Sequence, residues 1–280
     1  MKRLKAIILI GLPLLVIVLV TAFSTRVLVV YEHLVHIDNL PPHLEGLRIL
    51  QISDLHSNHP TRINMDIWPY IWDLEFDLAV ITGDIVLDGH WGPNEPIVEL
   101  NPHKEQLAKL ARLVPTFFVE GNHESAQSYR FKPIMENLGI HFLFNERSLL
   151  YVGGGYLEII GTKDHSTMVR QGFDGLDELF GPDFALVLTH QPQLFDRFKH
   201  HGSMLVLAGH THGGQIRLPF LPVLYAPGQG IFPRYGKGFY YYGEAVLYVS
   251  RGVGTTYFPL RFLSRPEIAV FELMMGECTQ

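Results

Sequence analysis

The chain has 280 residues, of which 47% are hydrophobic, and it carries 22 Lys and Arg against 28 Asp and Glu, for a net charge of −6. This length and apolar content suffice for one large domain with a sizeable core. The acidic balance gives no electrostatic footprint for nucleic acid, so we expect no nucleic acid as a stable partner. The single cysteine, Cys278, excludes an internal disulfide framework and a thiolate-rich metal site.

The N-terminal segment, residues 1–25, has the pattern of a membrane anchor or a signal segment. Lys2, Arg3 and Lys5 precede an uncharged, mainly apolar run over residues 6–23. A transmembrane helix needs roughly 20 mainly apolar residues and a cleaved signal only about 7–15, so the run favours a transmembrane helix. Small residues near the end of the run leave a cleaved signal open. The basic residues before the run predict a cytoplasmic N-terminus and a main domain outside the cytoplasm.

Residues 26–280 form the predicted main domain, in which strand and helix patterns alternate. Apolar runs predict strands at residues 26–38, 47–52, 78–82, 116–119, 184–188, 204–208, 239–242, 245–249 and 268–273. Helices are predicted at residues 62–74, 103–113 and 128–138, long loops at residues 88–102 and 218–237, and a hairpin turn at residues 153–155. Early strand–helix alternation and a strand-rich second half predict an α/β fold of two stacked mixed sheets with helices outside.

Five short polar segments directly follow or lie close after five of these predicted strands. They are Asp54-Leu55-His56, Gly83-Asp84, Gly121-Asn122-His123-Glu124, His190 and Gly209-His210-Thr211-His212-Gly213. Ligands at strand ends are held by a rigid sheet while they face solvent and substrate. Carboxylate, amide and imidazole groups in this number are enough to hold two divalent metal ions, and they suit Mn, Fe, Zn, Ni or Co without choosing among them.

The residue types in these segments also suggest a reaction. Residues i and i+2 of a strand point to the same side, so we expect Asp54 and His56 to share one metal. Asp84 is the natural bridging carboxylate. Two metals about 3.5–4 Å apart clamp the attacking and leaving oxygens of a phosphoryl displacement, and they lower the pKa of a bridging water to supply hydroxide. His123, next to the predicted ligand Asn122, is suited to protonate the leaving alkoxide.

Each segment alone has an ordinary explanation, because Asp-x-His triplets and Gly-Asp turns are common on protein surfaces. The ordered set resembles the calcineurin-like metallophosphoesterase superfamily, whose signature is D-x-H, G-D, G-N-H-[DE], H and G-H-x-H. The resemblance covers nearly all of residues 47–273. It implies a four-layer α/β/β/α sandwich and a metal-dependent phosphoric ester hydrolase that attacks its substrate with a metal-bound hydroxide.

The resemblance further implies a role for each matched residue. One metal would take Asp54, His56, Asp84 and His212, and the other would take Asp84, Asn122, His190 and His210. His123 would orient or protonate the scissile phosphate ester. Glu124 stands where many members have Asp, and it would help to fix His123.

The Gly213-Gly214-Gln215 extension and the N-terminal anchor look similar to a bacterial membrane-associated subgroup of phosphodiesterases. This implies a single-pass protein of the bacterial cell membrane with an extracytoplasmic catalytic domain and a phosphate-ester substrate, with lipid or cell-envelope esters as candidates. One alternative is a hydrolase similar to the UDP-diacylglucosamine pyrophosphatase of lipid A synthesis, whose substrate is cytosolic. An alternative of another class is a non-catalytic scaffold that binds metal and interacts with other proteins. The presence of every expected ligand residue counts against this alternative.

Overall fold

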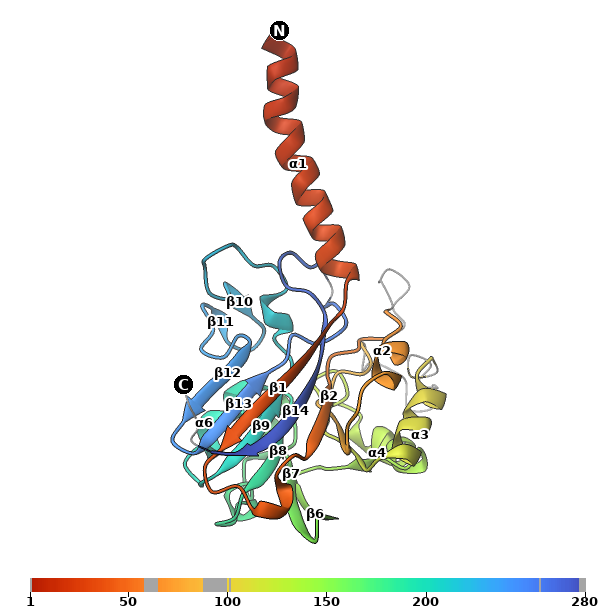
Figure 1. Ribbon diagram of the computed structural model, residues 1–280, viewed down its shortest axis with the longest axis vertical. Helices are drawn as coiled ribbons and strands as arrows, with labels where there is room; N and C mark the ends of the chain where they lie inside the picture. The colour runs from red at the N-terminus through yellow and green to blue at the C-terminus, as the bar shows by residue number, and fades with distance from the viewer. Residues whose placement is uncertain (1, 58–64, 88–99, 101, 257, 277–280) are drawn as a thin grey trace.

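The computed structural model describes residues 2–57, 65–87, 100, 102–256 and 258–276, with side chains from residue 11 onward. The chain begins with the helix α1 (Lys2–Arg26), which stands away from the rest of the molecule (Figure 1). Among the described residues, no helix combines the length and the apolar character that a bilayer crossing requires. The predicted transmembrane helix is therefore not supported by this part of the chain.

Two six-stranded sheets form the centre of the molecule, and both are mixed, as predicted. The first contains, in order, β1 (Val29–Ile37), β14 (Glu267–Met275), β2 (Arg48–Ile52), β3 (Leu78–Ile81), β4 (Thr116–Phe118) and β5 (His141–Phe142). The second contains β12 (Gly238–Tyr242), β13 (Ala245–Val249), β9 (Met204–Ala208), β8 (Ala185–Leu188), β7 (Gly155–Gly161) and β6 (Glu146–Val152). The antiparallel pairs are β14 with β2, β12 with β13, and β6 with β7, and the other neighbours are parallel.

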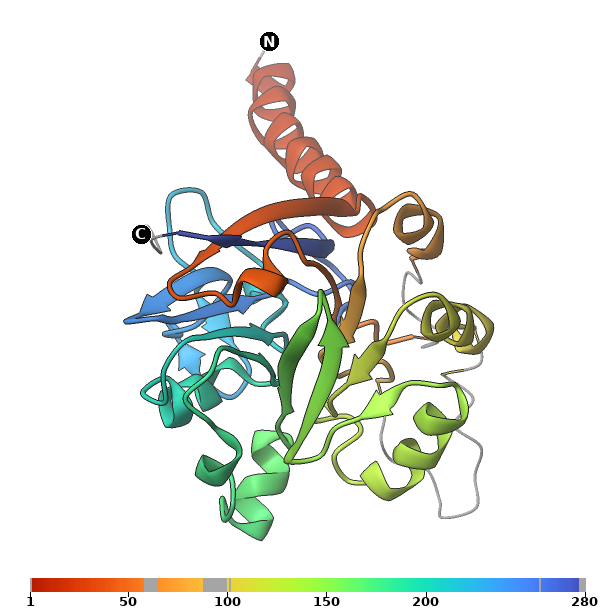
Figure 2. The same ribbon diagram turned by 60° about the horizontal axis from the view of Figure 1, so that its bottom comes forward.

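Helices cover the outer face of each sheet, which gives the predicted four layers (Figure 2). The first sheet is covered by α2 (Trp68–Trp72), α3 (Lys104–Leu113) and α4 (Ser128–Asn137), and the second by α5 (His165–Gln171) and α6 (Phe195–Phe198). Strand β3 shows why its sequence is apolar throughout. Leu78 and Val80 pack between the sheets, whereas Ala79 and Ile81 pack against the helices. A strand that is buried on both faces has no polar side to alternate with its apolar one.

Some local predictions differ from the structure. The helix expected at residues 62–74 is present only as α2, and residues 62–64 lie outside the described part, as does most of the loop expected at residues 88–102. The short helices α5 and α6 were not predicted, because one or two turns show little periodicity. The hairpin between β6 and β7 is confirmed, with positive φ values of 60° at Gly153 and 88° at Gly154, as a type I′ turn requires. The loop at residues 218–237 contains the short pair β10 (Tyr225–Ala226) and β11 (Gly230–Ile231).

The carboxyl ends of the central strands of both sheets meet along one edge of the sandwich. Hydrogen bonds join the two sheets there, since the Gln51 side chain at the end of β2 donates to the carbonyl of Ala208 at the end of β9, at 3.1 Å. Just beyond, the amide of Gly209 donates to the carbonyl of His190. This edge carries all five polar segments, so the topology alone brings residues from positions 54 to 212 together.

Candidate metal centre

The segments after the strands have an unusual backbone. Asp54, His56, Asp84, His210 and His212 all have positive φ, between 44° and 72°. A left-handed conformation costs roughly 1–2 kcal/mol per non-glycine residue and persists where the surroundings impose it, often at functional sites. The expectation that Asp54 and His56 share a side as neighbours in a strand is wrong. Strand β2 ends at Ile52, and two left-handed residues in the following loop turn both side chains inward.

Backbone hydrogen bonds continue between the loops after β2 and β3. The amide of Asp54 donates to the carbonyl of Gly83 at 3.0 Å, and the amide of His56 donates to the carbonyl of Asp84 at 3.0 Å. Ser57 then donates to the carbonyl of Ile85. The two loops therefore hold each other in register beyond the end of the sheet.

Two glycines allow the loops to pack closely. A Cβ added at Gly83 would lie 2.5 Å from the amide nitrogen of Gly121 and 2.8 Å from Nδ1 of His190, and the φ of Gly83 is +85°. A Cβ at Gly121 would overlap the Asp84 side chain. Only glycine fits both positions, because each brings backbone against a predicted ligand.

Glu124 joins these loops. Its carboxylate accepts hydrogen bonds from the amides of Gly121 at 2.8 Å, Asp84 at 2.9 Å and Val86 at 3.1 Å. The family resemblance implies that Glu124 helps to fix His123. These contacts hold the backbone of the His123 loop against Asp84, so the effect on His123 is through the loop.

All seven predicted ligands and His123 come together at this edge, in two adjoining groups. In the first, Nε2 of His212 lies 3.5 Å from Oδ1 of Asp54 and 3.1 Å from Nε2 of His56. One ligand atom from each of these three residues lies within 4.8 Å of the others. Asp84 connects this group to the second, because its Oδ2 lies 3.6 Å from Nε2 of His56.

The second group surrounds His190. Nε2 of His190 lies 3.2 Å from Oδ2 of Asp84, 3.2 Å from Oδ1 of Asn122 and 3.2 Å from Nδ1 of His210. The Asp84 carboxylate thus contacts both groups. This is the position expected of a carboxylate that bridges two cations.

The imidazole orientations fit divalent cations. Nδ1 of His56 faces the carbonyl of Val86 at 3.3 Å, and Nδ1 of His190 faces the carbonyl of Thr82 at 2.8 Å. Because a carbonyl only accepts, these Nδ1 atoms carry a proton, which leaves the Nε2 lone pair of the neutral ring for a metal. The Nε2 lone pair of His56 then points to Nε2 of His212. A cation that bound among these nitrogen and carboxylate atoms would displace the protons that they share.

Burial perturbs the ionisation of the group. Burial raises the pKa of Asp54 to about 6, the charge of His190 opposes this and the charge of Asp84 adds to it. Burial lowers the pKa of His210 to about 3, so its imidazole is neutral and available as a ligand at neutral pH. Two buried carboxylates side by side repel each other, and nearby positive charge relieves the repulsion.

His123 differs from the other histidines in its exposure. Its side chain is 16% exposed, whereas those of His56, His190 and His212 are at most 2% exposed. Nε2 of His123 lies 3.9 Å from Oδ2 of Asp84, and its amide donates to Oδ1 of Asp84 at 3.1 Å. The imidazole therefore stands between the shared carboxylate and solvent, where it can meet an incoming substrate.

Arg261 belongs to the centre, although no motif in the sequence indicates it. Its side chain is fully buried, and Nη2 lies 3.3 Å from Nδ1 of His212 and donates to the carbonyls of Arg251 at 2.9 Å and Gly252 at 3.2 Å. Its amide donates to Oγ1 of Thr25, at the end of α1. Arginine is rarely buried completely, so only the folded structure identifies this contact.

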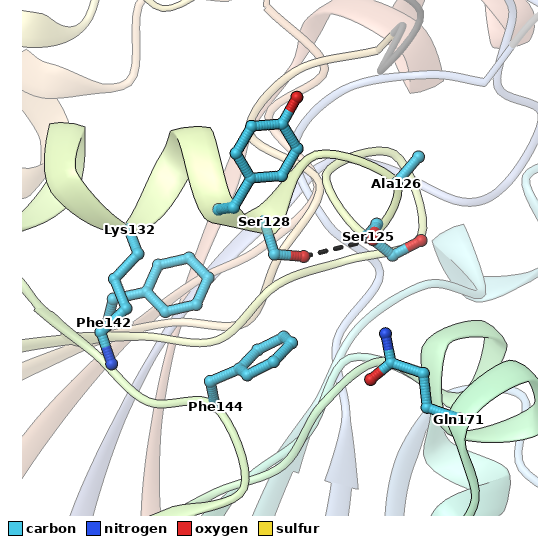
Figure 3. A pocket seen from close by; sticks show the side chains of 8 residues that line it. Ser125, Ala126, Ser128, Lys132, Phe142, Phe144 and Gln171 are labelled. Carbon is cyan, nitrogen blue, oxygen red and sulfur yellow. Dashed lines mark hydrogen bonds between the residues drawn. The ribbon is translucent and has the colours of Figure 1, made fainter.

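A hollow of about 360 Å³ lies beside the loop that carries His123 (Figure 3). Ser125, two residues beyond His123, forms part of its wall, and the rings of Phe142 and Phe144 form an apolar part of it. Lys132 and Gln171 line other sides, from α4 and α5. The hollow can accommodate an organic group beside the loop that carries Asn122 and His123.

A model of the calcineurin-like phosphoesterase family matches residues 47–214, a range that contains every predicted ligand. The chain is a calcineurin-like phosphoesterase. Members of this family are hydrolases of phosphoric esters that use divalent metals, so the chain is an enzyme of that class. The described residues include His and Asp groups that are able to bind metal.

Relatives support the family along most of the chain. The uncharacterized metallophosphoesterase YkuE of Bacillus subtilis (strain 168) is 31% identical over 251 residues, which are 86% of this chain and 84% of that protein. The phosphodiesterase YaeI of Escherichia coli (strain K12) is 30% identical over 243 residues, covering 85% of this chain and 84% of that protein. A transmembrane protein with metallophosphoesterase domain from Bos taurus is 29% identical, and the match covers 84% of this chain and 54% of the bovine protein.

Proposed function

We propose that the protein is a phosphodiesterase that hydrolyses its substrate with two divalent cations. The observation that carries the proposal is the position of Asp84, whose carboxylate lies within 3.2 Å of His190 and 3.6 Å of His56, between the two donor groups. The name of the relative YaeI, a phosphodiesterase, supports a diester as the substrate.

In this proposal each donor group holds one cation. Asp54, His56, Asp84 and His212 hold the first, and Asp84, Asn122, His190 and His210 hold the second. When bound, the cations supply Lewis acidity toward the phosphate oxygens and an activated water. Mn, Fe, Zn, Ni and Co all suit this donor set, and the native pair is found by loading the metal-free protein with each.

His123 has the role of a proton donor in the proposal. Its partly exposed Nε2 donates a proton to the leaving oxygen as the ester bond breaks. The carboxylate of Asp84 lies 3.9 Å from Nε2 of His123 and also accepts a hydrogen bond from the His123 amide, which positions the imidazole. A phosphodiester carries an organic group on each side of phosphorus, and the hollow beside Phe142 and Phe144 offers a place for one of them.

A substrate panel tests this function. The purified full chain, loaded with Mn, is assayed on bis-p-nitrophenyl phosphate, p-nitrophenyl phosphate and a UDP-sugar. The expected result is a kcat/KM for the diester at least tenfold above the other two, with activity lost in Asp54→Asn. A preference for the UDP-sugar would instead favour a pyrophosphatase, and absence of turnover with full metal loading would favour the non-catalytic scaffold.

The setting of the reaction is also a proposal. A phosphate ester from a lipid or from the cell envelope is the substrate class that agrees with an apolar N-terminal segment. The name of the bovine relative, a transmembrane protein, supports a membrane setting. The position of the domain outside the cytoplasm stays a prediction, which rests on the charges of Lys2, Arg3 and Lys5.

A further inference from the structure

We propose that the end of the molecule around the base of α1 docks on an anionic lipid surface, and that the metal centre acts on amphiphilic phosphate esters held there. The docking surface, which we call the basal patch, consists of Phe220, Ile231, Phe232, Phe258, Leu260 and Leu263. The second half of the proposal rests on the proposed function, whereas the docking itself does not.

The basal patch exposes large apolar side chains to solvent. Phe220 is 105% exposed, Ile231 76% and Phe232 63%. Contiguous exposed apolar surface on a folded protein usually marks a binding site for a protein or a membrane. Phe220 and Phe232 also have positive φ, 64° and 52°, so the loop presents these two rings in a conformation that bulky residues rarely adopt.

Hydrogen bonds connect the two loops of the patch to each other and to α1. Phe262 donates to the carbonyl of Gln215 at 2.9 Å, and Arg217 donates to the carbonyl of Phe262 at 2.9 Å. Leu263 donates to Oγ of Ser24, in the last turn of α1, at 3.0 Å. The loop around β10 and β11 and the base of α1 lie at the same end of the molecule (Figure 1). The bases of the two loops and the end of α1 therefore lie side by side.

The helix argues for lipid as the occupant. The six consecutive residues 14–19 are all apolar, and each is between 49% and 58% exposed. Six residues exceed one helical turn, so every side of this part of α1 is apolar. A helix that packs on a protein through one face keeps a polar face elsewhere, whereas a helix that is apolar all round suits a hydrocarbon environment.

Charge at this end complements an anionic surface. The whole chain has a net charge of −6, yet between residues 211 and 266 six Lys and Arg accompany a single acidic residue, Glu244. Of these six, Arg261 is buried, Arg251 pairs with Glu267, and Arg234 pairs with Asp196. Arg217, Lys237 and Arg265 are partly exposed, and the Arg265 guanidinium lies 5.3 Å from the ring centre of Phe23 on α1. Basic side chains beside exposed aromatic and aliphatic ones are typical of proteins that bind anionic lipids at the interface.

The basal patch adjoins the metal centre. The loop that exposes Phe220 and Ile231 outward touches the site inward, since a Cβ at Gly228 would lie 3.4 Å from Nε2 of the predicted ligand His210. A second contact joins this loop to the residue after His210, because Oγ1 of Thr211 donates a hydrogen bond to the carbonyl of Gly236 at 2.7 Å. An amphiphile whose chains stay in the lipid layer would thus present its phosphate group close to the metals.

Vesicle binding by the full chain tests the docking. The triple variant Phe220→Ser, Ile231→Ser, Phe232→Ser is compared with a control triple, Leu149→Ser, Tyr151→Ser, Tyr156→Ser, whose side chains are similarly exposed on the β6–β7 hairpin. In co-sedimentation, the wild-type chain and the control should bind phosphatidylglycerol vesicles at least tenfold more tightly than phosphatidylcholine vesicles. The patch variant should bind phosphatidylglycerol at least tenfold more weakly than the control. A charge variant, Arg217→Gln with Arg265→Gln, should lose the preference for phosphatidylglycerol.

Equal vesicle binding by the patch and control variants would overturn the docking, as would indifference of the wild type to lipid charge. Self-association that depends on the patch, without any effect on vesicles, would assign the surface to a second copy of the chain instead.

Hydrolysis of bis-p-nitrophenyl phosphate separates the docking proposal from the proposed function. It should be unchanged within about twofold in the patch variant, while hydrolysis of a phosphodiester lipid in vesicles falls with binding. Vesicle binding without any diester hydrolysis by the wild type would reject the proposed function alone.

Discussion

His123 is the most exposed histidine of the metal centre. Its neighbours in the centre are closed in by both sheets, and their Nδ1 atoms are occupied by carbonyl groups in the case of His56 and His190. A general acid needs access to the substrate, and the partial exposure of the His123 side chain provides it.

We therefore expect His123→Ala to keep its bound metal and to lose activity according to the leaving group. A general acid is typically worth about 10²–10⁴-fold in rate. The loss should be large for alkyl phosphodiesters, whose leaving alkoxide needs a proton, and small for p-nitrophenyl esters, whose leaving group is already a stable anion. Steady-state kinetics on both substrates and metal analysis of the variant provide the measurement. An equal loss on the two substrates would count against the acid role.

Arg261 acts on the centre through His212 and through the backbone around it. We expect Arg261→Met to be destabilised by about 3 kcal/mol or more, because it leaves several buried carbonyl oxygens without donors. Its affinity for the metal held with His212 should fall as well. Arg261→Lys should recover part of the stability and little of the affinity, since an ammonium group lacks the planar fork of donors.

Urea unfolding and metal titration of both Arg261 variants make the measurement. Arg265→Met, in the same loop, is the matched control, because Arg265 is partly exposed. If Arg261→Met bound both metals with wild-type affinity, the positioning role would be rejected, whatever its stability.

For individual residues, the sequence predicted the metal ligands better than the residues that hold those ligands in place. Asp, Asn and His residues after apolar strands are visible as a pattern. The Arg261 contact is not, because an arginine far along the chain has the same local pattern whether it lies on the surface or in the core. The carboxylate of Glu124 is a similar case, since its three amide donors are supplied by the folded loops.

At the scale of elements, the strands were predictable because their apolar runs are buried on both faces. The loops beyond them were not, because their conformation depends on tertiary contacts. Asp54 and His56 converge through left-handed residues, which no alternation rule anticipates. The short helices α5 and α6 form against the second sheet. Packing of Met168, Phe195 and Phe198 on that sheet outweighs weak local propensity.

His103, the residue just before α3, should couple the stability of the fold to pH. Burial lowers the pKa of His103 to about 4, with a smaller opposing effect from Asp66. Nδ1 of His103 accepts a hydrogen bond from Nε1 of Trp68 at 3.1 Å, which a protonated ring cannot do. Since the folded pKa is below the unfolded value of about 6.5, this stability is complete above pH 6.5 and is lost as the pH falls toward 4.

The expected contribution of His103 is about 1–2 kcal/mol between pH 6.5 and pH 4.5. The variant His103→Asn keeps an acceptor for Trp68 and removes the titrating group. Urea unfolding of both proteins across this pH range gives the difference between their free energies of unfolding. The effects of carboxylates that both proteins share cancel in this difference. The wild type should lose more stability than the variant, and parallel pH curves would show that His103 is not responsible.

At the scale of the whole molecule, the sandwich brings two halves of the chain to one edge. Residues 54–124 follow strands of the first sheet and residues 190–212 follow strands of the second, so neither half holds a complete centre. The layer order was predictable from the succession of strand and helix patterns. The basal patch was not, because its exposed rings come from two loops that only the fold places beside α1.

Calorimetric titration of the metal-free full chain with Mn tests whether Asp84 joins two bound cations. Two equivalents should bind per chain, and diester hydrolysis should require both. Asp84→Asn should bind fewer than two equivalents and lose nearly all activity, while the fold is kept. A wild-type chain that binds a single equivalent at full activity would show that Asp84 does not bridge two cations, as would an Asp84→Asn variant that binds two and turns over normally.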